Sequence, residues 1–204
     1  MMPAQSWQLC DPAYLADPAV PEAWWPAIRE SLPAYDARTT PTRTMGLVAE
    51  HFRTLPGTLR SAHPHRSFAA AGPHAARITA RHDLDSPVGE RSPLQPMYDL
   101  DGHVLLLGVG HDKSTTLHLA EDRSDHPSRR LVPNGAPLLV DGTRRWVPFD
   151  EPFVFDDDFP AVAAAFAADT GLVRSGRVGR AEAALLPQRP LVDYAADWFG
   201  RHRD

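Results

Sequence analysis

Residues 101–121 read DGHVLLLGVGHDKSTTLHLAE and contain the clearest succession of elements in this chain. The apolar run His103–Val109 follows an Asp-Gly turn signal and is typical of a strand. Because it contains four consecutive apolar residues, VLLL, we expect this strand to be buried on both faces. Two glycines then open a loop, in which Asp112 or Ser114 could cap a helix over residues 116–121. The stretch therefore predicts a buried strand, a loop and a helix.

His118 and Glu121 lie three residues apart in the expected helix and therefore share one face of it. A carboxylate beside an imidazole stabilises the imidazolium and can fix the ring tautomer. Such a pair is a competent base for an amine that attacks a thioester, a step to which a positioned base contributes ~10²–10⁴-fold. Thr115 or Thr116 could donate a hydrogen bond to the developing oxyanion. An incidental His/Glu pair on a surface helix is the alternative.

Upstream, residues 60–72 read RSAHPHRSFAAAG, a mixture that no packing rule requires. The chemistry-bearing side chains of this block are Ser61, His63, His65 and Ser67. The alanines and the glycine at the end of the block would let a ligand approach the backbone closely. The alternative is a polar loop held by Pro64.

Two other kinds of site can be weighed from the residue types. His63 and His65 could join His118 or Glu121 as zinc ligands, but no spacing here matches a zinc signature. The single cysteine, Cys10, lacks an activating motif and is a weak candidate for a nucleophile. We therefore expect a site without a metal ion.

The rest of the chain predicts further helices and one hairpin. The helices are expected at residues 28–32, 44–55, 73–82, 159–169 and 191–199. In the second of these, which Thr44 could cap, the apolar residues follow a helical period; they are Met45, Val48, Phe52 and Leu55. The best hairpin signal is Asp141-Gly142, between Pro137–Val140 and Thr143–Phe149.

The chain has 204 residues, of which 43% are hydrophobic and 23% charged, so we expect one globular domain over residues 1–204. No apolar run approaches the ~20 residues that span a bilayer. The N-terminus does not resemble a signal peptide, and one cysteine cannot form an internal disulfide. We therefore expect a cytoplasmic protein without a membrane partner. The formal net charge of −5 argues against nucleic acid, because binding to it requires clustered basic residues.

One ordered string of residues spans most of the chain, from about Met2 to Trp198. It comprises Met45-Gly46, Glu50, Phe52-Arg53, Pro56-Gly57, Arg60-Ser61, His63-Pro64, Ser67-Phe68, Ala70, Gly72, Ser92-Pro93, the strand Val104–Val109, Thr116-x-His118-x-x-Glu121 and Gly179-x-Ala181. This string resembles the aminoglycoside 3-N-acetyltransferase family. Its length and order make the resemblance more specific than either block alone.

The resemblance implies an α/β fold with a central mixed β-sheet flanked by helices. It implies an enzyme that transfers acetyl from acetyl-CoA to the 3-amino group of a 2-deoxystreptamine aminoglycoside and so confers antibiotic resistance. His118 would be the general base, with Glu121 beside it and Thr116 next to the reacting carbonyl. Acetylation of another amine, such as an aminophosphonate or a biosynthetic intermediate, is one alternative, and an inactive remnant is another.

The resemblance also implies which residues face the two substrates. The pantetheine and thioester end of acetyl-CoA would be lined by Arg60, Ser61, His63, Ser67 and Phe68. Charge complementarity with a polycationic acceptor adds Glu121, Asp99 and Asp150.

Family members carry a further segment before the stretch that corresponds to Met2-Pro3. We therefore expect the first strand and helix of the family's fold, and part of the cofactor site, to be missing from this chain. Exposed apolar surface is the expected consequence, with instability or dimerisation following from it. Both a monomer and a homodimer are compatible with the sequence.

Overall fold

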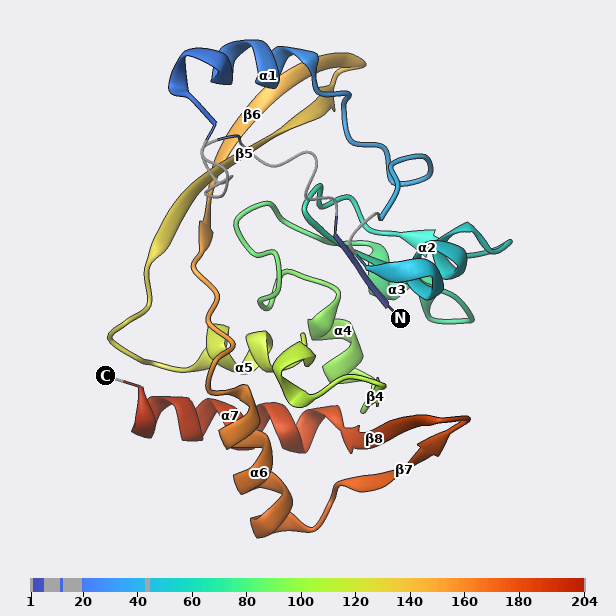
Figure 1. Ribbon diagram of the computed structural model, residues 1–204, viewed down its shortest axis with the longest axis vertical. Helices are drawn as coiled ribbons and strands as arrows, with labels where there is room; N and C mark the ends of the chain where they lie inside the picture. The colour runs from blue at the N-terminus through green and yellow to red at the C-terminus, as the bar shows by residue number, and fades with distance from the viewer. Residues whose placement is uncertain (1, 6–11, 13–19, 43–44, 204) are drawn as a thin grey trace. The chain divides into compact units, whose positions relative to one another are not determined.

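The computed structural model describes residues 2–5, 12, 20–42 and 45–203. Over these residues the chain divides into two compact units. The first unit comprises residues 1–87 and 131–151, and the second comprises residues 88–130 and 152–204. The chain thus leaves the first unit, returns to it, and ends in the second (Figure 1). The expectation of one domain over the whole chain stays a prediction.

The first unit combines short helices with a small antiparallel sheet. Its described helices are α1 (Trp25–Ser31), α2 (Gly46–Thr54) and α3 (Ala75–Thr79). The 3-10 turn η3 (Glu22–Trp24) precedes α1. Its sheet has the order β1-β3-β2, formed by β1 (Met2–Gln5), β3 (Arg66–Ala70) and β2 (Leu59–Arg60). Met2 lies opposite Ala69, and Leu59 lies opposite Ala70. The sheet therefore builds the second half of the 60–72 block into its central strand.

A long hairpin completes the first unit. Its strands are β5 (Leu131–Val140) and β6 (Thr143–Pro152), so the predicted hairpin is confirmed and both strands are longer than expected. Asp141 (φ 50°) and Gly142 (φ 75°) form its two-residue turn, the left-handed pair that a type I′ turn requires. Arg144 donates a 2.8 Å hydrogen bond to the carbonyl of Leu32. This bond links the residue that follows α1 to the start of β6.

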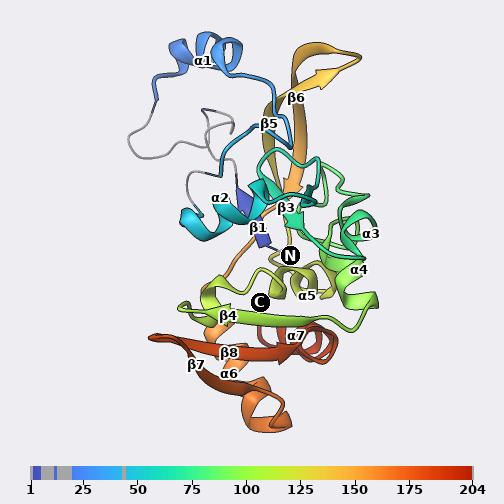
Figure 2. The ribbon, with the colours of Figure 1, turned by 90° about the vertical axis from the view of Figure 1, so that its right-hand side faces the viewer.

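The second unit packs helices against a three-stranded sheet. Its helices are α4 (Leu94–Asp99), α5 (Leu117–Arg123), α6 (Phe159–Thr170) and α7 (Gln188–His202), with the 3-10 turn η4 (His111–Lys113) before α5. The sheet has the order β4-β8-β7, formed by β4 (His103–Leu107), β8 (Ala181–Pro187) and β7 (Arg174–Val178). Figure 2 shows these three strands side by side. Helix α7 packs on both α5 and α6. Their shared core consists of Leu117, Leu119, Phe159, Phe166, Leu191 and Phe199, all fully buried.

The predicted α/β class is confirmed, but the strands are distributed differently from the single central mixed sheet that we expected. The described strands form three small sheets, and the pairings β1–β3, β2–β3, β4–β8 and β7–β8 are antiparallel. Tight turns join β5 to β6 and β7 to β8, and such turns pair neighbouring strands antiparallel, whereas parallel pairing requires a crossover. Among the described residues no helix is both long and apolar enough to cross a membrane.

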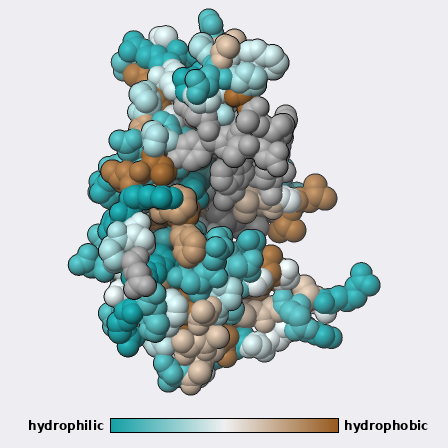
Figure 3. Space-filling view, turned by 60° about the vertical axis from the view of Figure 1, so that its left-hand side comes forward, coloured by the Kyte–Doolittle hydropathy of each residue, from teal (hydrophilic) through white to brown (hydrophobic). Residues whose placement is uncertain are grey.

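The expectation that strand 103–109 is buried on both faces is wrong. Of the residues of β4, Leu106 is buried, whereas Leu105 is 56% exposed and Leu107 is 44% exposed. β4 is an edge strand of an antiparallel sheet, in which one face commonly packs on the core and the other meets solvent. On the face of the molecule in Figure 3, hydrophobic side chains form separate small groups among hydrophilic ones.

Helix α2 confirms the helix expected over residues 44–55, but the apolar period does not mark its buried residue. Val48 is 69% exposed, and Ala49 is the buried residue of α2. The carboxylate of Glu50 accepts hydrogen bonds from the backbone (2.8 Å) and the hydroxyl (2.7 Å) of Thr42 and also binds Arg53. This anchor sets the rotation of the helix, so its polar contacts outweigh the apolar period. Thr44, the expected cap, and Cys10 lie outside the described residues.

Candidate active site

Helix α5 brings together the side chains of His118 and Glu121, the predicted general base and its carboxylate partner. His118 Nδ1 lies 2.8 Å from Glu121 Oε2, and the two side chains are only 12% and 8% exposed. Leu117, Leu119 and Ala120 of the same helix are fully buried, so their packing determines how the helix is oriented. The alternative of an incidental pair on a surface helix does not fit this burial.

The other oxygen of Glu121 is held as well. Glu121 Oε1 accepts hydrogen bonds from Arg203 Nη1 (2.6 Å) and from the backbone N–H of Phe155 (3.1 Å). Burial by itself raises the pKa of the Glu121 carboxyl, but the hydrogen bond from His118 and the charge of Arg203 outweigh it, so the pKa lies below its usual value. Glu121 is therefore an ionised carboxylate at neutral pH, positioned from both sides.

The imidazole of His118 keeps one nitrogen available. Its ring packs on Phe159, with ring centroids 4.8 Å apart. Glu121 engages Nδ1, whereas Nε2 has no hydrogen-bond partner among the described residues. An ionised carboxylate accepts and does not donate, so the proton of the neutral ring lies on Nδ1 and the lone pair on Nε2. That lone pair can take a proton from a bound amine.

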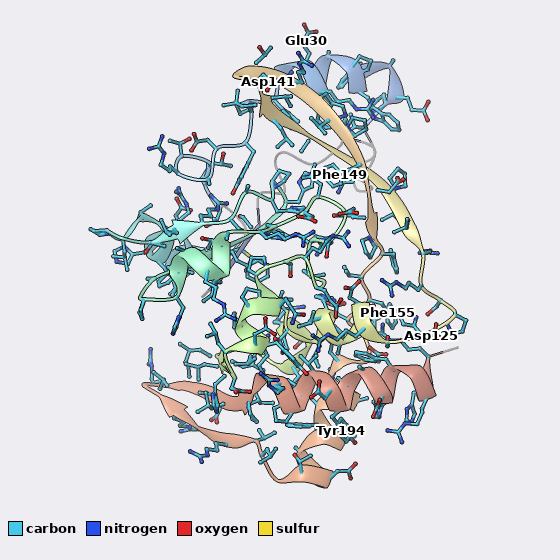
Figure 4. All side chains as sticks on the ribbon, turned by 180° about the vertical axis from the view of Figure 1, so that it is seen from behind. Glu30, Asp125, Asp141, Phe149, Phe155 and Tyr194 are labelled. Atoms are coloured by element: carbon cyan, nitrogen blue, oxygen red, sulfur yellow. The ribbon has the colours of Figure 1, made fainter. Side chains whose placement is uncertain are left out.

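Two cavities flank Glu121 within the second unit. One, of about 20 Å³, is lined by residues that include His118, Glu121, Asp122 and His126. The other, of about 440 Å³, is lined by Glu121, His126, Ser128, Arg130, Phe153, Phe155, Asp158, His202 and Arg203. Figure 4 shows Phe155 near α5 and the C-terminal end of α7. Glu121 thus lies in the wall of both cavities, whereas His118 lines only the smaller one.

The start of α5 carries two buried hydroxyl groups. Thr116 Oγ1 and Ser114 Oγ have no hydrogen-bond partner among the described residues. The expected capping of α5 by Asp112 or Ser114 is wrong: the N-cap is Thr116, without a side-chain cap bond, because the 3-10 turn η4 occupies residues 111–113. Thr116 Oγ1 is therefore a donor that the fold itself does not use.

The expected cofactor-side residues lie together in the first unit. Ser61 and Phe68 face each other across the start of β3, with Ser61 N–H donating to Phe68 O (2.9 Å) and Phe68 N–H donating to Ser61 Oγ (2.8 Å). Arg60 Nε donates to Ser67 Oγ (2.8 Å), and the Arg60 guanidinium lies over the ring of Tyr35. Ser61, Ser67 and Phe68 are buried. These residues therefore hold the block in one conformation.

The histidines of this block also serve its conformation. His63 Nδ1 accepts hydrogen bonds from the backbone N–H groups of His65 and Arg66, both at 3.2 Å, and Nε2 lies 3.2 Å from Leu84 O. Burial lowers the pKa of His63 well below its usual value, and His82 and His65 lower it further. A neutral, fully bonded ring fits the alternative of an ordered polar loop.

The two remaining predicted acidic residues, Asp99 and Asp150, are both exposed. Asp99 is exposed at the end of α4, where it accepts a hydrogen bond from Gln95 (2.9 Å). Asp150 is exposed on β6 in the first unit. Among the described residues no group of three or more His, Cys, Asp or Glu side chains could hold a metal ion. The roles of Asp99 and Asp150 stay predictions.

Sequence reasoning missed Arg203 and Asp158. Arg203 is 82 residues from Glu121 along the chain, and no local pattern links them. Asp158 belongs to the acidic run Asp156-Asp157-Asp158, and acidic residues are favoured at the start of a helix. It does occupy the N-cap of α6, but it makes no side-chain cap bond there. It binds Arg203 at 2.7 Å instead.

Comparison with known proteins adds to this geometry. A model of the aminoglycoside 3-N-acetyltransferase family matches residues 1–200. The SPbeta prophage-derived aminoglycoside N(3')-acetyltransferase-like protein YokD of Bacillus subtilis (strain 168) is 42% identical over 200 residues, which cover 98% of this chain and 72% of that protein. The crystal structure of YokD matches with a TM-score of 0.93 over 98% of this chain and 74% of its own.

Two further relatives are enzymes by name. Aminoglycoside N(3)-acetyltransferase VII of Streptomyces paromomycinus is 37% identical over 200 residues, covering 90% of this chain and 69% of that enzyme. The structure of AAC-IIIb, solved as a binary complex with CoASH, is 32% identical, with a TM-score of 0.80 over 90% of this chain and 70% of its own. The chain belongs to the aminoglycoside 3-N-acetyltransferase family and is an N-acetyltransferase.

Proposed function

We propose that this protein transfers an acetyl group from acetyl-CoA to the 3-amino group of an aminoglycoside, with His118 as general base. The observation that carries the proposal is the buried His118–Glu121 pair, whose Nε2 has no partner among the described residues. Membership of the family supports the reaction, and the CoASH complex of AAC-IIIb supports the donor. The name of the Streptomyces paromomycinus enzyme supports the acceptor class.

The proposed chemistry follows from the two ring nitrogens of His118. The acceptor nitrogen attacks the thioester carbonyl, and the N–C bond forms as Nε2 removes the proton from that nitrogen. Glu121 stabilises the resulting imidazolium through Nδ1–H. When the tetrahedral intermediate collapses, the C–S bond breaks, and the imidazolium can return its proton to the leaving thiolate. The hydroxyl of Thr116 would donate to the oxyanion, because the fold leaves it without another acceptor.

The side chains proposed to contact the two substrates differ in how far their polar atoms are already hydrogen-bonded within the protein. Arg60, Ser61, His63, Ser67 and Phe68 are proposed to form a rigid wall for the pantetheine and thioester end, since hydrogen bonds to other protein groups hold the block in place, among them Arg60 to Ser67, Phe68 N–H to Ser61 and His63 to Leu84 O. Protein groups that are already ordered lose little conformational entropy when a ligand binds. Glu121, Asp99 and Asp150 are proposed to meet the polycationic acceptor; both oxygens of Glu121 are already engaged, whereas Asp99 and Asp150 are exposed.

The test is a thiol-release assay with acetyl-CoA and a panel of aminoglycosides, performed on the wild type and on His118→Ala. We expect the variant to lose at least about 100-fold in kcat, since a general base contributes ~10²–10⁴-fold, while circular dichroism shows a retained fold. His103→Ala, which alters an exposed histidine of the same unit, serves as the matched control. Near-wild-type turnover by His118→Ala would show that His118 is not the general base. Turnover of an aminophosphonate in place of every aminoglycoside would support the alternative acceptor.

A further inference from the structure

Arg203 is a buried cation that follows the last turn of α7. It is 9% exposed, and its backbone N–H caps the helix by donating to Phe199 O at 3.0 Å. Its guanidinium lies over the ring of Phe199, 3.9 Å from the centroid. A charge in such a place is costly unless it is paired and hydrogen-bonded. Its partners therefore indicate what the charge does.

Two carboxylates and a carbonyl hold the guanidinium. Nε and Nη2 bind the two oxygens of Asp158, both at 2.7 Å, in the bidentate arrangement that suits an arginine fork. Nη2 also donates to Phe155 O at 3.0 Å. Nη1 is thereby directed at Glu121 Oε1, 2.6 Å away. Asp158 and Phe155 thus orient Arg203, and Arg203 orients Glu121.

The charges of this group are complementary to the chemistry of His118. Glu121 and Asp158 carry two negative charges, and Arg203 carries one positive charge. When the imidazole of His118 takes up a proton, the four side chains become neutral as a set. A preorganised, partly buried charge arrangement of this kind is worth more than the same charges in water.

We infer that Arg203 is a positioning residue for acetyl transfer: it holds the Glu121 carboxylate so that Oε2 meets His118 Nδ1 and Nε2 is left as the proton-accepting nitrogen. This inference rests on the proposed function, because it assigns the proton-accepting role to His118. Arg203 itself does not touch the substrate in this scheme. A lysine could supply the charge but not the fork that joins Asp158 to Glu121.

Other titratable and charged groups also surround Glu121. Asp122 and Arg129 form an ion pair at 2.8 Å. His126 is buried in the wall of both cavities. Burial lowers the pKa of His126, and the charge of Arg203 lowers it further, so this histidine is neutral at pH 7. His202, at the end of α7, lines the larger cavity. Arg203 is the cation in direct contact with Glu121 among the described residues, so its removal should act on the carboxylate first.

The first test uses NMR and does not require activity. In Arg203→Met, the ¹³C signal of the Glu121 carboxyl is expected to titrate at a higher pH than in the wild type, because burial is no longer opposed by the guanidinium. The ¹⁵N shifts of His118 are expected to show a mixture of ring tautomers in place of the Nδ1–H form. Arg189→Met is the matched control, since Arg189 pairs with exposed Asp101 at the other end of α7. Unchanged Glu121 titration and His118 tautomer in folded Arg203→Met would overturn the inference.

The second test is kinetic. For Arg203→Met we expect kcat to fall roughly 10- to 100-fold, the range seen when a supporting contact of a catalytic group is lost, with KM changed little. The acid limb of the kcat profile should move to higher pH, and Arg203→Lys should recover part of kcat. A loss of kcat with an unchanged pH profile would mean that Arg203 is only structural and would overturn the inference.

Two further outcomes can be distinguished: a variant that does not fold and a wild type that transfers no acetyl group. If Arg203→Met does not fold, Asp158→Asn loosens the same guanidinium from its other side and should shift the Glu121 titration in the same direction by a smaller amount; no shift would count against the inference. If the wild type transfers no acetyl group, the proposed function fails. In that case the NMR comparison still decides whether Arg203 positions Glu121 and His118.

Discussion

At the residue scale, the hydroxyl of Thr116 separates activity from stability. Thr116 Oγ1 is buried and has no partner among the described residues, so Thr116→Val should leave the free energy of unfolding unchanged or slightly higher. If the hydroxyl donates to the oxyanion, kcat should fall about 10²–10³-fold, as for the loss of one such donor. Urea unfolding and the thiol-release assay measure the two effects. Thr116→Ser, which keeps the hydroxyl, is the control, and equal kcat in the valine variant would contradict the role.

The half-buried histidine His82 gives stability a pH dependence. Burial lowers its pKa to about 4, whereas an unfolded histidine titrates near 6.5. Between these values the unfolded chain binds a proton that the folded chain does not, so stability is lost as pH falls from about 6.5 towards 4. The slope is about 1.4 kcal/mol per pH unit for one proton. Urea unfolding at a series of pH values should show a shallower dependence for His82→Asn. Identical slopes would show that other groups dominate.

At the scale of elements, β4 and α2 show how tertiary contacts override a local pattern. The VLLL run predicted a strand correctly, but its edge position decided that one face meets solvent. The period of α2 predicted a helix correctly, but the anchoring of Glu50 on Thr42 decided its rotation. In both cases the type of element is set by its own residues, whereas its buried face depends on contacts with residues outside the element.

The leucines of β4 provide a direct test of this correction. Leu106→Ala should cost about 2–5 kcal/mol in the free energy of unfolding, the range for a buried leucine. Leu105→Ala, which changes a side chain that is 56% exposed, should cost no more than about 0.5 kcal/mol. Urea unfolding of the two variants makes the comparison within one strand. Similar losses in both would support the original expectation of burial on two faces.

At the scale of the whole molecule, acetyl-CoA binding distinguishes an enzyme from an inactive remnant. A ligand that binds only the folded state stabilises it by about 2.7 kcal/mol at 100 times its Kd. We therefore expect acetyl-CoA to raise the midpoint of thermal unfolding in the wild type and, since His118 is assigned to proton transfer, equally in His118→Ala. Differential scanning calorimetry and isothermal titration measure both. The absence of binding by the wild type would favour the remnant.

The sequence by itself determined the hairpin turn at Asp141-Gly142 and the placing of His118 and Glu121 on one helical face. These features depend on residues within a few positions of each other, where backbone geometry alone sets the relation. Only the tertiary structure decided which faces of α2 and β4 are buried, and that Arg203, 82 residues away, holds the Glu121 carboxylate. Such contacts depend on how helices pack, because packing brings together side chains that no local pattern relates.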